Sequence, residues 1–98
     1  IRQTADGRFL LVSNRGHNSI AVFSCTPQGL SPLRWIDAHG QDPRDFLLLK
    51  NFLLAANRTS RSLSIFKFNP QAAEAEFCQT VSFPAAPVCV AAAEKNFT

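Results

Sequence analysis

The sequence contains no apolar run that approaches the roughly 18 residues of a membrane-spanning helix. It also has no run of basic residues and no basic patch interleaved with aromatic side chains, the patterns typical of proteins that bind nucleic acid. What it does have is 46% apolar and 17% charged residues, a composition typical of soluble globular proteins. We therefore expect neither a membrane nor a nucleic acid among its partners.

The three cysteines form no CxxC pair and show no spacing typical of a metal site. Cys25, Cys78 and Cys89 all lie in apolar segments that resemble strands, which predicts buried free thiols. Free thiols favour a reducing compartment, so we expect a cytoplasmic protein. Nothing in the sequence indicates a metal ion or a cofactor.

Arginine is the dominant basic residue. The net charge is +3, and arginine outnumbers lysine by seven to three. A guanidinium group binds a carboxylate or phosphate group through two parallel hydrogen bonds, whereas an ammonium group acts as a point charge. This bias favours a small anionic ligand.

A repeat organises the chain: residues 9–23 return without a gap as residues 52–66, which lie 43 positions later. The identical pairs are Phe9/Phe52, Leu10/Leu53, Leu11/Leu54, Asn14/Asn57, Arg15/Arg58, Ser19/Ser62 and Phe23/Phe66. A period of this length marks a repeat architecture with one supersecondary unit in each copy.

Each copy consists of an apolar run, a short polar turn and a second run that alternates between apolar and polar residues. Alternation places one side of a strand inward, so each copy predicts a β-hairpin. A helix over residues 47–56 is the competing interpretation. Asn51 interrupts its apolar pattern, however, and Asp6-Gly7 stands at the equivalent place in the first copy, so we prefer strands.

The remaining segments extend each hairpin to a four-stranded antiparallel meander. We expect strands at residues 1–4, 9–13, 19–25 and 30–38, then at 44–48, 52–56, 62–68 and 76–83, with a longer surface connection at 69–75. Residues 84–87 repeat the proline-containing connection that leads into the second meander, which predicts the inner strand of a third sheet at 88–92. Four-stranded repeats that close into a ring form a β-propeller. The class is all-β.

We thus expect one partial domain over residues 1–98, with blades at 1–38 and 43–83 and a closing inner strand at 87–92. Two units alone would leave large apolar faces open. The chain also begins at Ile1. We therefore expect a C-terminal fragment whose partners include the remaining blades of a longer parent chain.

Four segments, DGRFLLVSNRGHNSIAVF, DPRDF, LLAANRTSRSLSIFKFNP and FPAAPVCV, resemble in order and spacing the C-terminal part of the seven-bladed propeller lactonases. That family includes the 6-phosphogluconolactonases of the cycloisomerase type and is similar to the carboxy-cis,cis-muconate lactonizing enzymes. The resemblance covers residues 5–90, and the departures are a shortened turn at 49–51 and the tail at 94–98. It implies a seven-bladed propeller for the parent chain.

Candidate site residues follow from the order of the strands. In an up-and-down meander alternate connections share one edge of the sheet, so the loop at 14–18 and the connection at 38–44 should lie together. This places Arg15, His17, His39 and Arg44 on one face. Lactone hydrolysis needs a base to activate water and a cationic or hydrogen-bonding group at the carbonyl oxygen.

The resemblance implies an arginine of the channel site at Arg15. We take Arg15 and His17 as the catalytic candidates, His17 as a possible base, and Arg44 as the contact for an anionic substrate; further groups are expected on other blades. The alternative for Arg15 is structural: it could tie its loop to Asp42 or Asp45, and Arg58 repeats it. His17 and His39 could equally stabilise loops, and Asn14 and Asn57 are expected to cap them.

The function that the resemblance implies for the parent is hydrolysis of a sugar lactone, with 6-phosphogluconolactone of the pentose phosphate pathway as the first choice. The fragment alone would be inactive, and ring closure instead of ring opening stays open. The alternative is a non-catalytic propeller that serves as a binding or scaffold module. A third possibility is a remnant that does not fold alone.

Overall fold

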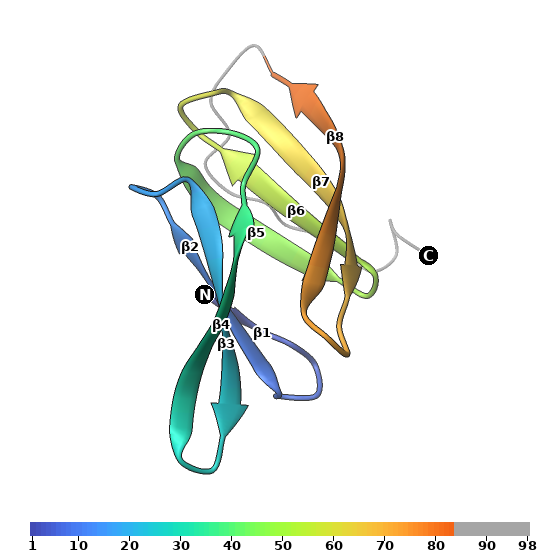
Figure 1. Ribbon diagram of the computed structural model, residues 1–98. Coiled ribbons are helices and arrows are strands. Elements are labelled where there is room, and N and C mark those ends of the chain that lie inside the picture. The colour runs from blue at the N-terminus through green and yellow to red at the C-terminus, as the bar shows by residue number, and fades with distance from the viewer. Residues whose placement is uncertain (84–98) are drawn as a thin grey trace.

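Two four-stranded antiparallel sheets make up the chain in the computed structural model, which describes residues 1–83 (Figure 1). The first sheet has the order β1 (Arg2–Gln3), β2 (Phe9–Asn14), β3 (Ser19–Thr26), β4 (Gly29–Asp37). The second has the order β5 (Pro43–Leu49), β6 (Phe52–Asn57), β7 (Ser62–Asn69), β8 (Glu74–Ser82). No helix of the described chain is long and apolar enough to cross a membrane.

The sequence repeat is a structural repeat. Asn14 pairs with Ser19 at the end of the first hairpin, and Asn57 pairs with Ser62 in the second, so equivalent residues hold equivalent places in the ladder. The segment 47–56 forms parts of β5 and β6 and not a helix. The expected all-β class and the two meanders are therefore confirmed, while the strand expected at 87–92 lies outside the described residues.

The connection before β8 is shorter than expected. We predicted a surface connection over residues 69–75, but β7 extends to Asn69 and β8 begins at Glu74, and these two residues are paired. The turn is closed by Ala73, whose φ of 52° lies in the left-handed region and whose side chain is fully buried. Ala73 belongs to the apolar core, and its residue type does not signal this backbone conformation.

The core lies between the two sheets, which pack against each other through β2 and β5. Its large side chains come from both sheets and are Leu11, Ile20, Val22, Phe46, Leu53 and Phe66. Each side chain of this size contributes roughly 1.5–3 kcal/mol when fully buried. The outermost strands, in contrast, expose apolar residues such as Leu33, Trp35 and Phe77.

The prediction of buried thiols is wrong for the cysteines that the structure describes. Cys78 is exposed and Cys25 is half-buried. Cys78 lies on the outer strand β8, where the register shifts by one residue, so the strand order and not the apolar context decides its exposure. Both are free thiols. Cys89 lies outside the described residues.

The connection between the sheets packs closely against the second sheet at Gly40. A Cβ atom at this position would overlap the side chain of Asn57, which is fully buried. The Nδ2 group of Asn57 donates a hydrogen bond of 2.9 Å to Oγ of Ser64, and this hydroxyl donates to the backbone oxygen of His39 at 3.2 Å. The backbone at Gly40 and the side-chain amide of Asn57 are therefore tightly packed against each other.

We expect Gly40→Ala to lower the free energy of unfolding by about 1–3 kcal/mol, since an added methyl group in a packed interior displaces its neighbours. Chemical denaturation of the purified protein measures this change. Gly16→Ala is the matched control, because a Cβ atom there would meet only Oδ1 of Asn14 at 4.0 Å. Equal losses for the two variants would contradict the proposed overlap.

Candidate active-site rim

Three connections meet at one end of the molecule, the upper end in Figure 1, and we call them the rim: residues 14–18, 38–42 and 57–61. The backbone N–H of Asp42 donates to Oδ1 of Asn18 at 2.9 Å, and the N–H of Arg58 donates to the backbone oxygen of Asp42 at 2.8 Å. The N–H of Gln41 donates to Oγ of Ser60 at 3.0 Å. Hydrogen bonds therefore join both hairpin loops to the connection between the sheets.

Asp42 is the centre of the rim. Its Oδ1 accepts a hydrogen bond of 2.7 Å from Nε of Arg15, and its Oδ2 accepts one of 2.9 Å from Nε of Arg58. The carboxylate side chain is 15% exposed, whereas the two arginine side chains are 48% and 45% exposed. Arg15 therefore contacts Asp42 and not Asp45, whose carboxylate pairs with Arg2 at 3.3 Å.

These contacts change the acidity of the carboxyl group. The hydrogen bond from Arg15, supported by the charges of Arg15 and Arg58, lowers the pKa of Asp42 below its ordinary value of 3.8, although partial desolvation opposes the shift. The carboxylate is the form that both arginines stabilise. At neutral pH Asp42 is therefore an anion that its two arginine neighbours stabilise.

His17 and Arg15 occupy the same loop but lie against different parts of the molecule. Nδ1 of His17 is 2.8 Å from Oγ of Ser19, and the imidazole ring lies 5.1 Å from the ring of Trp35, on the outermost strand β4. These residues border a cavity of about 570 Å³ that also includes Asp37 and Gln41. In the described residues, therefore, Arg15 reaches the connection between the sheets while His17 reaches the outer strand.

His39 is an aromatic packing residue. Its ring is stacked on Phe77 with a centroid distance of 3.9 Å and meets the edge of Phe66 at 5.9 Å. Asn14 caps its loop as expected, because its Oδ1 accepts a hydrogen bond from the backbone N–H of His17 at 3.3 Å. Asn57 instead binds the serines of its own hairpin, and its Oδ1 is buried without a hydrogen-bond partner in the described chain.

Arg44 is exposed on β5, the first strand of the second sheet, two residues after Asp42. Within residues 1–83 it forms no ion pair. It is therefore a cation placed beside the rim with its charge uncompensated by a described carboxylate.

The rim has the chemistry of an anion-binding surface. Arg15 and Arg58 supply charged hydrogen-bond donors, and no group of histidine, cysteine or acidic residues in the described part of the chain could hold a metal ion. Sequence reasoning missed that Arg15 and Arg58 converge on one carboxylate. The sequence feature that could have indicated this convergence is the Asn-Arg pair that opens each hairpin loop, together with Asp42 in the connection between the two hairpins.

Paired four-stranded meanders joined at a rim define the chain as blades of a β-propeller. The chain belongs to the family described as "Lactonase, 7-bladed beta-propeller", whose family model matches residues 1–92.

Relatives of known sequence or structure agree with this assignment. The 6-phosphogluconolactonase of Bacillus subtilis is 45% identical over 49 residues, which are 48% of this chain and 14% of that protein. The solved structure of a protein from Lactobacillus plantarum has a TM-score of 0.83 at 32% identity and is matched over 90% of this chain and 27% of that one. A periplasmic gluconolactonase from Pseudomonas aeruginosa has a TM-score of 0.79 at 32% identity, over 87% of this chain and 25% of that one. The chain thus spans about a quarter of the solved relatives.

The lowered pKa of Asp42 predicts a loss of stability in acid. Above its ordinary pKa of 3.8 the ionised carboxylate contributes its full stabilisation, and this contribution is lost as the pH falls through the lower pKa of the folded state. Asp6 acts in the same direction, because the N–H of Arg8 and the hydroxyl of Thr4 bind its carboxylate and lower its pKa. We expect the unfolding temperature to fall between about pH 5 and about pH 2, and Asp42→Asn to reduce that fall.

Thermal unfolding of the purified protein across this range measures the effect. Glu76→Gln, which removes a carboxylate on β8 outside the rim, is the control and should keep the wild-type acid profile. An Asp42→Asn variant with the same acid profile as the wild-type protein would refute the contribution of the two arginines.

Proposed function

We propose that the whole protein, of which this chain would supply two blades and a closing strand at 87–92, hydrolyses a sugar lactone. The carrying observation is a rim rich in arginine on a chain of the propeller lactonase family. The proposed substrate is 6-phosphogluconolactone and the product 6-phosphogluconate, as in the pentose phosphate pathway. The name of the Bacillus subtilis relative supports this substrate. The proposed location is the cytoplasm, supported by the free thiols of Cys25 and Cys78, although one solved relative is periplasmic.

Hydrolysis requires three events at the ring ester. Water attacks the carbonyl carbon, the bond from that carbon to the ring oxygen breaks, and the ring oxygen takes up a proton to become a hydroxyl group. The product carboxylic acid then releases one proton to solvent. Negative charge develops on the carbonyl oxygen during attack, and donors fixed in advance at that oxygen lower the barrier.

We assign Arg15 to the carbonyl oxygen. Its Nε is held by Asp42 at 2.7 Å, which orients the guanidinium group and leaves its terminal N–H groups for substrate. Arg44 is the proposed contact for the anionic part of the substrate, because it is exposed and carries no ion pair with residues 1–83. The remaining blades of the parent chain would complete the channel, so this chain by itself would be inactive.

His17 is the proposed group for activating water. In the tautomer in which Nδ1–H donates to Oγ of Ser19, Nε2 carries the lone pair that a base needs. Its packing on Trp35 supports the competing structural role. A base from another blade is the alternative within the same reaction.

One observation favours the non-catalytic propeller as a second candidate. Arg15 and Arg58 share the carboxylate of Asp42, so both could serve only to fasten the loops, and the exposed Trp35 beside His17 would suit a binding surface. A direct assay of turnover separates the two candidates.

We expect the full-length protein to hydrolyse 6-phosphogluconolactone, and Arg15→Ala to reduce kcat about a hundredfold, the usual loss when one donor to a developing oxyanion is removed. Arg44→Ala should instead raise KM, because it removes a contact that substrate and transition state share. Steady-state kinetics measure both changes.

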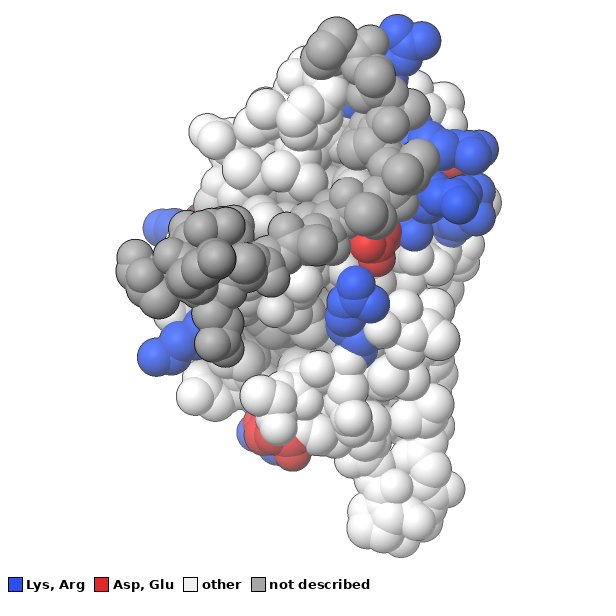
Figure 2. Space-filling model, turned by 180° about the vertical axis from the view of Figure 1, so that it is seen from behind, with Lys and Arg blue, Asp and Glu red and all other residues white. Residues whose placement is uncertain are grey.

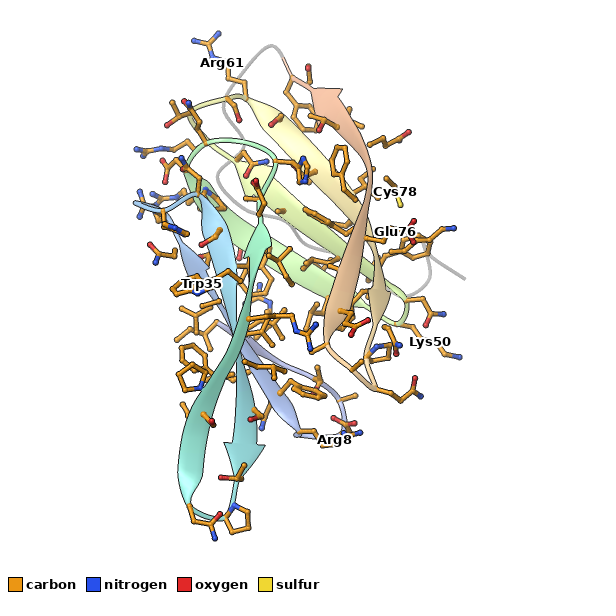
Figure 3. The ribbon with its side chains drawn as sticks, viewed as in Figure 1. Arg8, Trp35, Lys50, Arg61, Glu76 and Cys78 are labelled. Carbon is orange, nitrogen blue, oxygen red and sulfur yellow. The ribbon has the colours of Figure 1, made fainter. Side chains whose placement is uncertain are left out.

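Arg8→Ala is the control for removal of an exposed arginine, since Figure 3 places Arg8 at the opposite end of the molecule from Arg61 of the rim. Unfolding temperatures must show that each variant is folded. A folded wild-type protein without turnover on sugar lactones would leave the binding propeller as the better account.

A further inference from the structure

Two arginines from adjacent sheets share one carboxylate. Arg15 and Arg58 both bind Asp42 through Nε, at 2.7 Å and 2.9 Å. Within the described chain the terminal Nη groups of these two arginines form no hydrogen bond, and roughly half of each side chain is exposed. Each guanidinium group therefore keeps its outer edge, with four N–H donors, for a ligand.

The carboxylate that positions them is itself fixed. The backbone N–H of Asp42 is bound by Asn18, and its backbone oxygen accepts the N–H of Arg58. Its φ of 59° lies in the left-handed region, directly before Pro43, where this conformation is disfavoured. Such a conformation persists only where surrounding contacts determine it, so the backbone that carries the shared carboxylate is positioned before a ligand arrives.

The charge of this cluster remains positive. One carboxylate faces two guanidinium groups, and the exposed Arg44 follows two residues after Asp42. Figure 2 shows Lys and Arg side chains gathered along one edge of the molecule, with a smaller acidic area beside them. A ligand with two separate anionic or electron-rich groups suits such a cluster better than a single carboxylate does, because each guanidinium group forms its own pair of hydrogen bonds.

We propose that Arg58 binds the phosphate group of a phosphorylated sugar lactone while Arg15 faces its carbonyl oxygen, and that Asp42 fixes the spacing between these two contacts. Arg58 then adds a second contact to that of Arg44, and through it the site prefers a phosphorylated lactone to the same lactone without phosphate. This inference rests on the proposed function and adds to it a specificity-determining residue from the second sheet. Asp42 is a positioning residue, since it acts through the two arginines.

The test compares two substrates, 6-phosphogluconolactone and glucono-δ-lactone, in the full-length protein. We expect Arg58→Ala to lower the ratio of their kcat/KM values by about tenfold to a hundredfold, the range for losing hydrogen bonds to a charged group. The loss should come from a higher KM for the phosphorylated lactone. Arg15→Ala should lower kcat for both substrates, because the carbonyl oxygen is common to them.

Two further variants separate this role from a structural one. Arg58→Lys keeps the charge but lacks the planar guanidinium group that offers Nε to Asp42 and two Nη groups to phosphate, so it should recover only part of the ratio. Arg61→Ala removes an exposed arginine from the same loop, which Figure 3 shows extending away from its neighbours, and should keep the wild-type ratio. Competition by inorganic phosphate provides an independent measurement, and inhibition should be weaker in Arg58→Ala than in the wild-type protein.

The outcomes are distinct. A folded wild-type protein that hydrolyses neither lactone overturns the proposed function, and this inference with it. Hydrolysis with an unchanged substrate ratio and unchanged phosphate inhibition in Arg58→Ala overturns the inference alone. If the wild-type protein hydrolyses only the phosphorylated lactone, no ratio can be measured. In that case an unchanged KM for this substrate in Arg58→Ala overturns the inference alone.

Discussion

The pairing of Asp42 with two arginines is the interaction on which the organisation of the rim depends. Asp42 belongs to neither sheet and lies in the connection between them, while Arg15 and Arg58 each open a hairpin loop of their own sheet. Ion pairs this exposed contribute little to stability individually. Their importance is geometric, because they bring charges from segments 43 residues apart in the sequence to one place.

Much of the fold could be predicted from the sequence because the repeat appears twice. The identical residues of the two copies fall at the same ladder positions, which fixed the hairpins and the antiparallel order. The turn before β8 could not be predicted, since the left-handed alanine at position 73 carries none of the glycine or asparagine signals of such turns. The exposure of Cys78 was missed because the prediction used the apolar context of the residue, whereas the place of β8 at the edge of its sheet decides its exposure.

The candidate site was predictable to the level of loops but not of side chains. Strand order alone placed the connections on a common edge, and the hydrogen bonds between them agree with that placement. Strand order does not determine where a loop side chain points. Arg15 and His17 are two residues apart, yet one reaches Asp42 and the other packs on Trp35. The contact of Arg58 with Asp42 could not be predicted, because the sequence does not show that both hairpin loops turn toward the same aspartate.

The close approach of Gly40 to Asn57 also has a consequence for sequence variation. The backbone of the connection and the amide of β6 fill a single volume, so an increase in size at one position requires a decrease at the other. The free energies of substitutions at these two positions should therefore be strongly non-additive, as is usual for residues that share a packed space. In related chains we would look for paired changes here, with a side chain at position 40 accompanied by a smaller residue at position 57.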